Sequence, residues 1–242
     1  SDDDSGSNSS NNYSNNYSNM TVESMAREVA GFYRDVSDAL APLRASSRGR
    51  LLYAHGALAP WTPGSACECG TGSALGNGRV GRRFLVNMLS YAPTLFAAPS
   101  RVDWLSSHSY PFSGAGWGNP KAFHGLEWYK NESDAISGAR RVLGKPAEAL
   151  PVIITETGWR RDAARGVLGA ERANWTALAF DRIWLRDTQV VGVAPFLLAG
   201  GALWQDLGWP WMNVSAGGVL VPNPVFSRVR RLRCKYFPSA SC

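Results

Sequence analysis

Four short apolar runs, each followed by a stretch with helical periodicity, constrain what this chain of 242 residues can fold into. Within each run the apolar residues are nearly continuous and do not alternate with polar ones, which is typical of strands buried on both faces. The runs are LLYAHGAL (51–58), VDWLSSHSY (102–110), PVIITET (151–157) and VVGVAPFLLA (190–199). One helix followed by four strand–helix units predicts an α/β fold of the (β/α)8 TIM-barrel type, with only about four of the eight units present.

The helices of this scheme are predicted from apolar residues spaced three and four positions apart, as in Val22, Met25, Ala26 and Val29. They cover about 21–44, 80–92, 132–144, 169–187 and 223–236. A self-contained open α/β sheet is the alternative architecture. It is the weaker one, because no glycine-rich phosphate loop follows the first strand.

Residues 1–20 differ from the rest of the chain, since they are mostly Ser, Asn, Asp and Gly. Such a segment cannot bury enough apolar area to offset the entropy lost on ordering, so we predict a disordered linker or insertion. Residues 21–242 are then one partial barrel domain. No run of 18 apolar residues occurs, so no membrane span is expected.

The formal net charge is +6, and its densest cluster is RVRRLRCK (228–235) on the predicted terminal helix. No aromatic RNA-binding signature accompanies this cluster. We therefore interpret it as a solvated helix face and expect no nucleic-acid partner.

Cysteines and glycosylation sequons bear on the compartment. Cys67 and Cys69 form a C-x-C pair with no nearby histidine, which argues against a metal site, and Cys234 and Cys242 lie close together near the other end. Seven asparagines begin N-x-S/T: Asn8, Asn12, Asn16, Asn19, Asn131, Asn174 and Asn213. Together with an even cysteine count they favour a secreted, extracellular or lumenal protein. For the first four, chance in an Asn/Ser-rich segment is an equally good explanation.

Polar and aromatic residues gather where the predicted strands end. In parallel α/β folds the functional groups lie at the C-terminal ends of strands, so we expect these side chains to share one edge. They are His55, Trp61, His108, Tyr110, Glu156, Trp159, Trp204, Trp209 and Trp211. Indoles pack on the C–H faces of pyranose rings, and a carboxylate can attack or stabilise an oxocarbenium-like centre. A His and a Tyr beside that carboxylate could hold it ionised by hydrogen bonds.

These segments resemble a known family. PVIITETGW (151–159) resembles the nucleophile strand of retaining (β/α)8 glycoside hydrolases of clan A, where an apolar seventh strand ends in T/S-E-x-G-W. DWLSSHSYPF (103–112) resembles their sixth strand, with its D-x-x-x-x-H-x-Y pattern. The segment 190–209 is similar to the eighth strand, which often delivers a Trp under the sugar, and LLYAHGALAP (51–60) fits the fifth loosely.

The resemblance, which covers about residues 21–236, implies retaining hydrolysis of a β-linked polysaccharide or glycoside without a metal or organic cofactor. Glu156 would be the nucleophile, and His108 and Tyr110 its orienting partners. Trp204 would be the sugar platform, with Trp209 as the alternative. His55, Trp61 and Trp159 would be further substrate-binding residues.

The chain departs from the family pattern in its acid/base. Clan A enzymes take this group from an N-E pair that closes the fourth strand. Here Asn131-Glu132 is predicted in a loop entering a helix, and Glu68 and Glu127 end no predicted strand. We therefore expect the acid/base outside this chain, which would be the C-terminal half of a barrel. The missing N-terminal half, or another chain, would cover the exposed strand edges. A non-catalytic carbohydrate-binding or structural glycoprotein is the alternative hypothesis.

Overall fold

The structure is a computed structural model that describes residues 22–47, 52–54, 57, 79–96, 102–111, 123–144, 149–159, 169–200 and 208–238. The described helices are α1 (Val22–Ser46), α2 (Arg79–Tyr91), α3 (Trp128–Val142), α4 (Gly169–Arg182) and α6 (Pro224–Tyr236), with 3-10 turns η1 (Phe123–Glu127) and η3 (Trp184–Arg186). The described strands are β1 (Leu105–His108), β2 (Val152–Glu156), β3 (Val190–Val193), β4 (Met212–Val214) and β5 (Leu220–Pro222).

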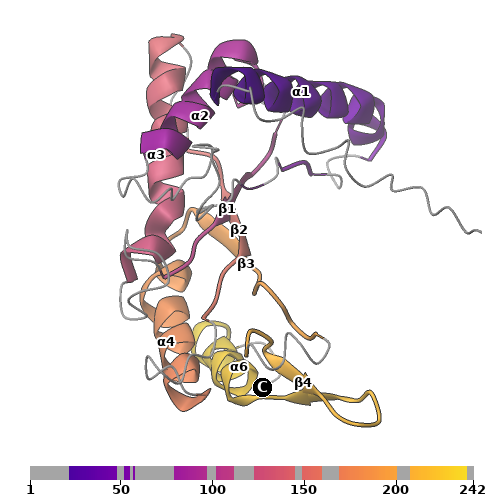
Figure 1. Cartoon of the computed structure of the whole chain (residues 1–242), viewed down its shortest axis with the longest axis vertical. Coiled ribbons are helices and arrows are strands. Elements are labelled where there is room, and N and C mark those ends of the chain that lie inside the picture. The colour runs from indigo at the N-terminus through magenta and orange to yellow at the C-terminus, as the bar shows by residue number, and fades with distance from the viewer. Residues whose placement is uncertain are drawn as a thin grey trace, which may run out of the picture.

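The main sheet is parallel and its strands follow chain order, β1-β2-β3. A parallel bridge from Ala54 to Trp104 places the first apolar run beside β1. Helices α3 and α4 connect successive strands, so the predicted mixed α/β fold with parallel βα units is confirmed (Figure 1). Within the described ranges the sheet does not close into a barrel.

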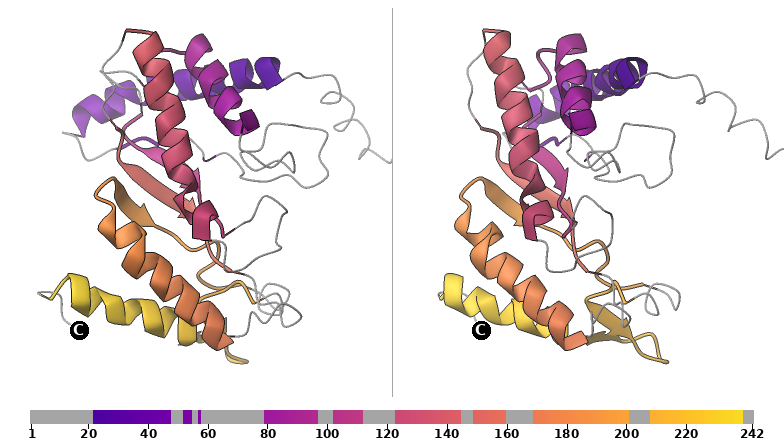
Figure 2. Two further views of the ribbon diagram at one scale, coloured as in Figure 1. Left: turned by 90° about the vertical axis from the view of Figure 1, so that its left-hand side faces the viewer. Right: turned by 60° about the vertical axis from the view of Figure 1, so that its left-hand side comes forward.

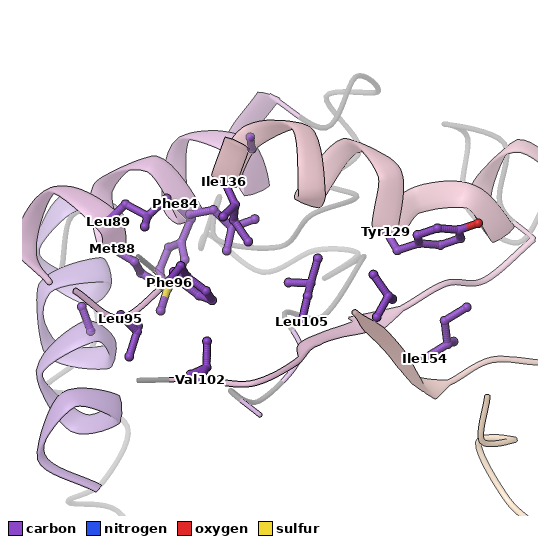
Figure 3. Packing of buried hydrophobic residues seen from close by; sticks show 14 of the residues in the cluster. Phe84, Met88, Leu89, Leu95, Phe96, Val102, Leu105, Tyr129, Ile136 and Ile154 are labelled. Carbon is purple, nitrogen blue, oxygen red and sulfur yellow. The ribbon is translucent and has the colours of Figure 1, made fainter. Parts of the chain in front are cut away.

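Helices α3 and α4 lie on one side of the sheet, on the left in Figure 1 and in front of the strands in the left view of Figure 2, and α2 packs beside α3. The hydrophobic core fills the layer between these helices and the sheet. Figure 3 shows Tyr129 and Ile136 of α3 facing Leu105 of β1 and Ile154 of β2. Each of these side chains is buried, and removing such a side chain from water contributes about 1.5–3 kcal/mol.

Several sequence-based boundaries change. Helix α3 begins at Trp128, so Asn131 and Glu132 lie inside a helix and not in a loop entering one. Strand β3 ends at Val193 and is only partly buried, because β2 is its one partner among the described strands. The antiparallel hairpin of β4 and β5 was not predicted, although the Gly217-Gly218 turn between two apolar stretches was its signal.

The structure also bears on the cysteines and on membrane-spanning helices. Cys234 is disulfide-bonded, while the other three cysteines lie outside the described residues. None of the described helices combines the length and apolar character that a membrane crossing requires.

Asp103 joins the first helix to the start of the sheet. Its carboxylate accepts two hydrogen bonds from Arg44 Nη2, at 2.6 and 2.7 Å, and one from the Tyr53 backbone N–H at 2.7 Å. The backbone N–H of Asp103 returns a bond to the Tyr53 carbonyl at 2.7 Å. Asp103 therefore fixes α1 and the first apolar run against β1, at the opposite end of the strand from His108.

We predict that Asp103→Ala lowers the free energy of unfolding by about 2–3 kcal/mol, because three charge-assisted hydrogen bonds are lost at a half-buried site. Urea denaturation measures this change. Asp35→Ala is the matched control, since the Asp35–Arg34 pair is exposed and joins adjacent residues. Its loss should be below about 0.5 kcal/mol, and equal losses in the two variants would contradict the proposed role of Asp103.

Candidate active site

The carboxyl ends of β1 and β2 meet at His108 and Glu156, which are paired across the two strands. The register shifts just before this pair, because Ile154 faces Ser107 while Glu156, two residues on, faces His108. Thr155 is therefore the extra residue of a β-bulge. Successive side chains of a regular strand alternate between faces, so without the bulge Glu156 would share the helix-facing side of Ile154. The bulge turns Glu156 onto the face of His108.

Tyr110 and His108 converge on one oxygen of Glu156. The Tyr110 hydroxyl donates to Glu156 Oε2 at 3.0 Å, and His108 Nδ1 lies 3.5 Å from the same atom. Tyr110 is buried, whereas the Glu156 side chain keeps 35% of its surface exposed. One side of the carboxylate is thus held by protein while the other remains open to a ligand.

The electrostatics define the protonation of both partners. Burial, followed by the charge of Glu156 and the hydrogen bond to it, raises the pKa of Tyr110 far above the usual value of 10. Burial also lowers the pKa of His108 below 6.5, and the opposing charge of Glu156 does not offset this effect. At neutral pH the phenol is therefore a proton donor and the imidazole is uncharged.

An aromatic cluster encloses the Tyr110 side of the site. The rings of Tyr110, Phe196 and Trp209 lie edge to face, with centroids 5.9 Å apart for Tyr110–Trp209, 5.2 Å for Phe196–Trp209 and 6.5 Å for Tyr110–Phe196. Of the residues predicted to bind substrate, Trp209 is thus the one that the structure brings beside the His108, Tyr110 and Glu156 group. It is only 7% exposed, so most of its surface packs on protein.

Two other predicted residues within the described ranges, Trp159 and Trp211, pack elsewhere. Trp159 is buried in the core and packs against Trp175, with ring centroids 6.5 Å apart. Trp211 packs against Phe180 in a second core cluster with Val225 of α6. His55, Trp61, Trp204 and Glu68 lie outside the described residues.

Hydrogen bonds beyond the strand ladder hold the three strand ends together. The backbone N–H of Ser109 donates to the Glu156 carbonyl at 3.1 Å, and the Thr157 hydroxyl donates to the Ser109 carbonyl at 2.5 Å. The Phe196 N–H donates to the Thr157 carbonyl at 2.9 Å. These bonds flank Glu156 on both sides and fix the backbone that carries it.

Gly158 allows the chain to turn directly after this point. Its φ of +138° lies in a region that residues with a Cβ rarely adopt. A Cβ at this position would meet the Trp209 ring no closer than 3.9 Å, an ordinary contact. The requirement for glycine is therefore one of backbone conformation, and it accounts for the glycine in the ITETGW stretch.

Glu132 is the residue near the site whose position the sequence reasoning missed. It lies on α3 behind β1, is 2% exposed, and hydrogen bonds to Ser107. Complete burial raises the pKa of Glu132 to about 8, and the nearby Ser107 hydroxyl and Trp128 indole do not offset this. The sequence pattern that could have indicated this burial is the spacing of Tyr129, Glu132 and Ile136, which places the three side chains on the same buried face of the helix.

No group of three or more His, Cys, Asp or Glu side chains that could hold a metal occurs in the described ranges. What the geometry offers is an oriented, partly exposed carboxylate beside a proton-donating phenol. Such a carboxylate can act as a nucleophile or stabilise a developing cation.

Comparisons with known proteins give a distant and partial similarity. No family model matches the chain, and no curated protein matches it. A ScGas2 structure in complex with a compound aligns with a TM-score of 0.42 and 11% identity, over 91% of this chain and 38% of that chain. A mutant of Saccharomyces cerevisiae Gas2p in complex with laminaritetraose and laminaripentaose aligns with a TM-score of 0.31 and 12% identity, over 58% of this chain and 25% of that chain. The chain therefore spans less than two fifths of these matched chains, and similarity at this level decides nothing about activity.

We predict that Gly158→Ala lowers the free energy of unfolding by about 1–3 kcal/mol, because alanine is strained at this φ. Chemical denaturation measures the change. Gly138→Ala in α3 is the control, since a Cβ there has open space in a regular helix and should stabilise by up to about 1 kcal/mol. A neutral or stabilising Gly158→Ala would contradict the strained conformation.

We also predict that the stability of the protein falls as the pH rises from about 4.5 towards 8. The folded-state pKa of Glu132, about 8, lies above its ordinary value of 4.5, so folding favours the neutral acid. The stabilisation that Glu132 contributes is fully present below pH 4.5, the pKa in the unfolded chain, and it is lost as the pH rises to about 8, the pKa in the folded protein. At about 1.36 kcal/mol per unit the loss is at most about 5 kcal/mol. Glu132→Gln, neutral at every pH, should remove this pH dependence in thermal unfolding, and an unchanged profile in the variant would contradict the shift.

Proposed function

We propose that this chain carries the nucleophile of a retaining glycoside hydrolase that acts on a β-linked polysaccharide or glycoside. The observation that carries the proposal is the convergence of Tyr110 and His108 on one oxygen of Glu156 at the carboxyl edge of a parallel sheet. That edge is where α/β enzymes place their chemistry. Because 35% of the Glu156 side chain is exposed, a ligand can reach the carboxylate.

The proposed reaction is a double displacement. A Glu156 carboxylate oxygen attacks the anomeric carbon and forms a glycosyl ester, while the bond to the leaving oxygen breaks and that oxygen takes a proton from an acid. Water then attacks the anomeric carbon, gives its proton to the same group acting as base, and releases Glu156 as carboxylate. The chemistry needs no metal or organic cofactor.

Tyr110 and His108 have distinct roles in this scheme. Tyr110 stays protonated and its hydroxyl donates a hydrogen bond to Glu156 Oε2, which fixes the orientation of the carboxylate. The uncharged His108, with Nδ1 3.5 Å from the same oxygen, is the second group that orients the carboxylate. Trp204 is the proposed platform for the sugar ring, and Trp209, which lies beside Tyr110 but is only 7% exposed, is the alternative.

We propose that the acid/base lies beyond the described residues. Glu132 is on the helix-facing side of β1, opposite to Glu156, and Glu127 is paired with Lys130 at the start of α3. A retaining site needs its second carboxyl about 5 Å from the nucleophile, and neither residue lies on that face. A (β/α)8 barrel closed by an N-terminal half, or by another chain that covers the strand edges, would supply both the acid and the missing strands.

We further propose a secreted or lumenal location. Cys234 is disulfide-bonded, which suits an oxidising compartment. Asn131, Asn174 and Asn213, each the first residue of a sequon, are all exposed on the structure. A glycan could therefore be carried at these positions without disturbing the core.

A non-catalytic carbohydrate-binding or structural glycoprotein is the second candidate. It is favoured by the position of Glu132 and Glu127, since neither supplies a second carboxyl beside Glu156 among the described residues. The hydrogen-bonded Tyr110 counts against it, because a binding surface has no need of a carboxylate held in one orientation and half-exposed. The two candidates differ in whether Glu156 reacts.

We predict that an activated 2-deoxy-2-fluoroglycoside labels Glu156 covalently, because its good leaving group needs little help from an acid. Intact-mass and peptide mass spectrometry of the full chain measure the adduct. Tyr110→Phe should label about 10–100-fold more slowly, since the carboxylate loses its orienting donor.

Glu156→Gln is the control and should show no adduct. Labelling that persists in this variant, or the absence of any adduct on the wild-type chain across β-configured fluoroglycosides, would contradict the enzymatic proposal. The second result would favour the non-catalytic alternative.

A further inference from the structure

A row of buried polar groups lies directly behind the proposed nucleophile, on the helix-facing side of β1. Ser107 and Ser109 are both completely buried, and their hydroxyl oxygens are 3.2 Å apart. Ser107 is hydrogen bonded to Glu132 of α3. At the other end, the Ser109 carbonyl accepts the Thr157 hydroxyl. A continuous polar path therefore runs from α3 through β1 to the residue that follows Glu156.

This path occupies a layer that is otherwise apolar. Leu105 precedes Ser107 on the same face of β1, and Figure 3 shows it packed below Tyr129 and Ile136, the residues that flank Glu132 on the same stripe of α3. A buried carboxyl with incomplete hydrogen bonding costs stability, and Oε2 of Glu132 has no hydrogen-bond partner among the described residues. Apolar residues would pack this layer at a lower free-energy cost, so the polar row calls for a role beyond stability.

The row lies beside one of the two register shifts in the described sheet, the one between β1 and β2. The bulge at Thr155 breaks the regular ladder between Ser107 and His108, so the strand hydrogen bonds alone do not fix the end of β1. His108 lies between the two serines, and Tyr110 directly follows Ser109. Whatever holds Ser107 and Ser109 on one face therefore sets the direction of His108 and Tyr110 on the other face.

We propose that Glu132, acting through Ser107 and Ser109, is a positioning residue that orients His108 and Tyr110 towards Glu156. The proposal rests on the proposed function, because it assigns Glu132 to the nucleophile of that reaction. A neutral acid has an O–H that can be donated to Ser107, and the Ser107 hydroxyl, 3.2 Å from that of Ser109, is then available to donate to Ser109. The carboxylate would reverse this order, because it could only accept.

This role requires Glu132 to be protonated, and its burial favours the protonated form. Burial raises the pKa of Glu132 to about 8, so the neutral form predominates at pH 7. Gln at this position can still donate through its amide, whereas Leu fills a similar volume without any donor.

The experiment compares Glu132→Gln, Glu132→Leu and Ser107→Ala in the full chain, with Ser133→Ala as the matched control. Ser133 is buried on the same helix, but it bonds to Gln189 at 2.7 Å and not to the row behind Glu156. Two readouts are taken at pH 7: the rate of labelling of Glu156 by the fluoroglycoside, and the pKa of His108 from NMR titration of its imidazole. Circular dichroism confirms that each variant is folded.

We expect Glu132→Gln and Ser133→Ala to match the wild-type chain in both readouts. Glu132→Leu and Ser107→Ala should label about 10–100-fold more slowly, and the pKa of His108 should move back towards 6.5. Folded Glu132→Leu and Ser107→Ala variants with wild-type labelling and an unchanged His108 pKa would overturn the proposal. If Glu132→Leu does not fold, Ser107→Ala decides by the same criteria.

The two proposals fail separately. An unlabelled wild-type chain overturns the enzymatic function, and the NMR titration still decides whether Glu132 positions His108. A labelled wild-type chain whose labelling is indifferent to Glu132→Leu and Ser107→Ala overturns only the role of Glu132.

Discussion

The extra residue at Thr155 is the constraint on which the arrangement of this molecule depends. Parallel pairing brings the ends of β1 and β2 to one edge, but it does not decide which face of the sheet Glu156 occupies. Regular alternation would send Glu156 towards α3, into the apolar layer of Leu105 and Ile154. The bulge places the Glu156 side chain on the opposite face of the sheet, where it contacts His108 and Tyr110.

Burial then gives each partner its chemical character. Tyr110 is enclosed by Phe196 and Trp209, which keeps its proton in place and makes it a donor. The same loss of solvent keeps His108 uncharged. Glu156, in contrast, keeps a third of its side chain exposed. A single sheet edge therefore combines two desolvated, neutral groups with one accessible anion, an arrangement suited to a nucleophile.

Local patterns predicted much of this fold, and their failures have physical causes. The apolar run before Glu156 is strand β2, and the periodicities gave α1, α2, α4 and α6 within a few residues. His108, Tyr110 and Glu156 were expected together because parallel strands end at one edge. The bulge and the buried position of Glu132 depend on packing between distant segments. Trp159 was placed with the site by its nearness to Glu156 in sequence, but the turn at Gly158 directs it into the core.

The central claim is that the Tyr110 phenol and the Glu156 carboxylate interact directly, and a double-mutant cycle on stability tests it. The variants are Tyr110→Phe, Glu156→Ala and the double variant, with free energies of unfolding measured in urea at pH 7. A part-buried hydrogen bond from a phenol to a carboxylate predicts a coupling energy of about 1.5–3 kcal/mol between the two positions. Effects that add within about 0.5 kcal/mol would mean that the two side chains do not interact, and would contradict this account of the site.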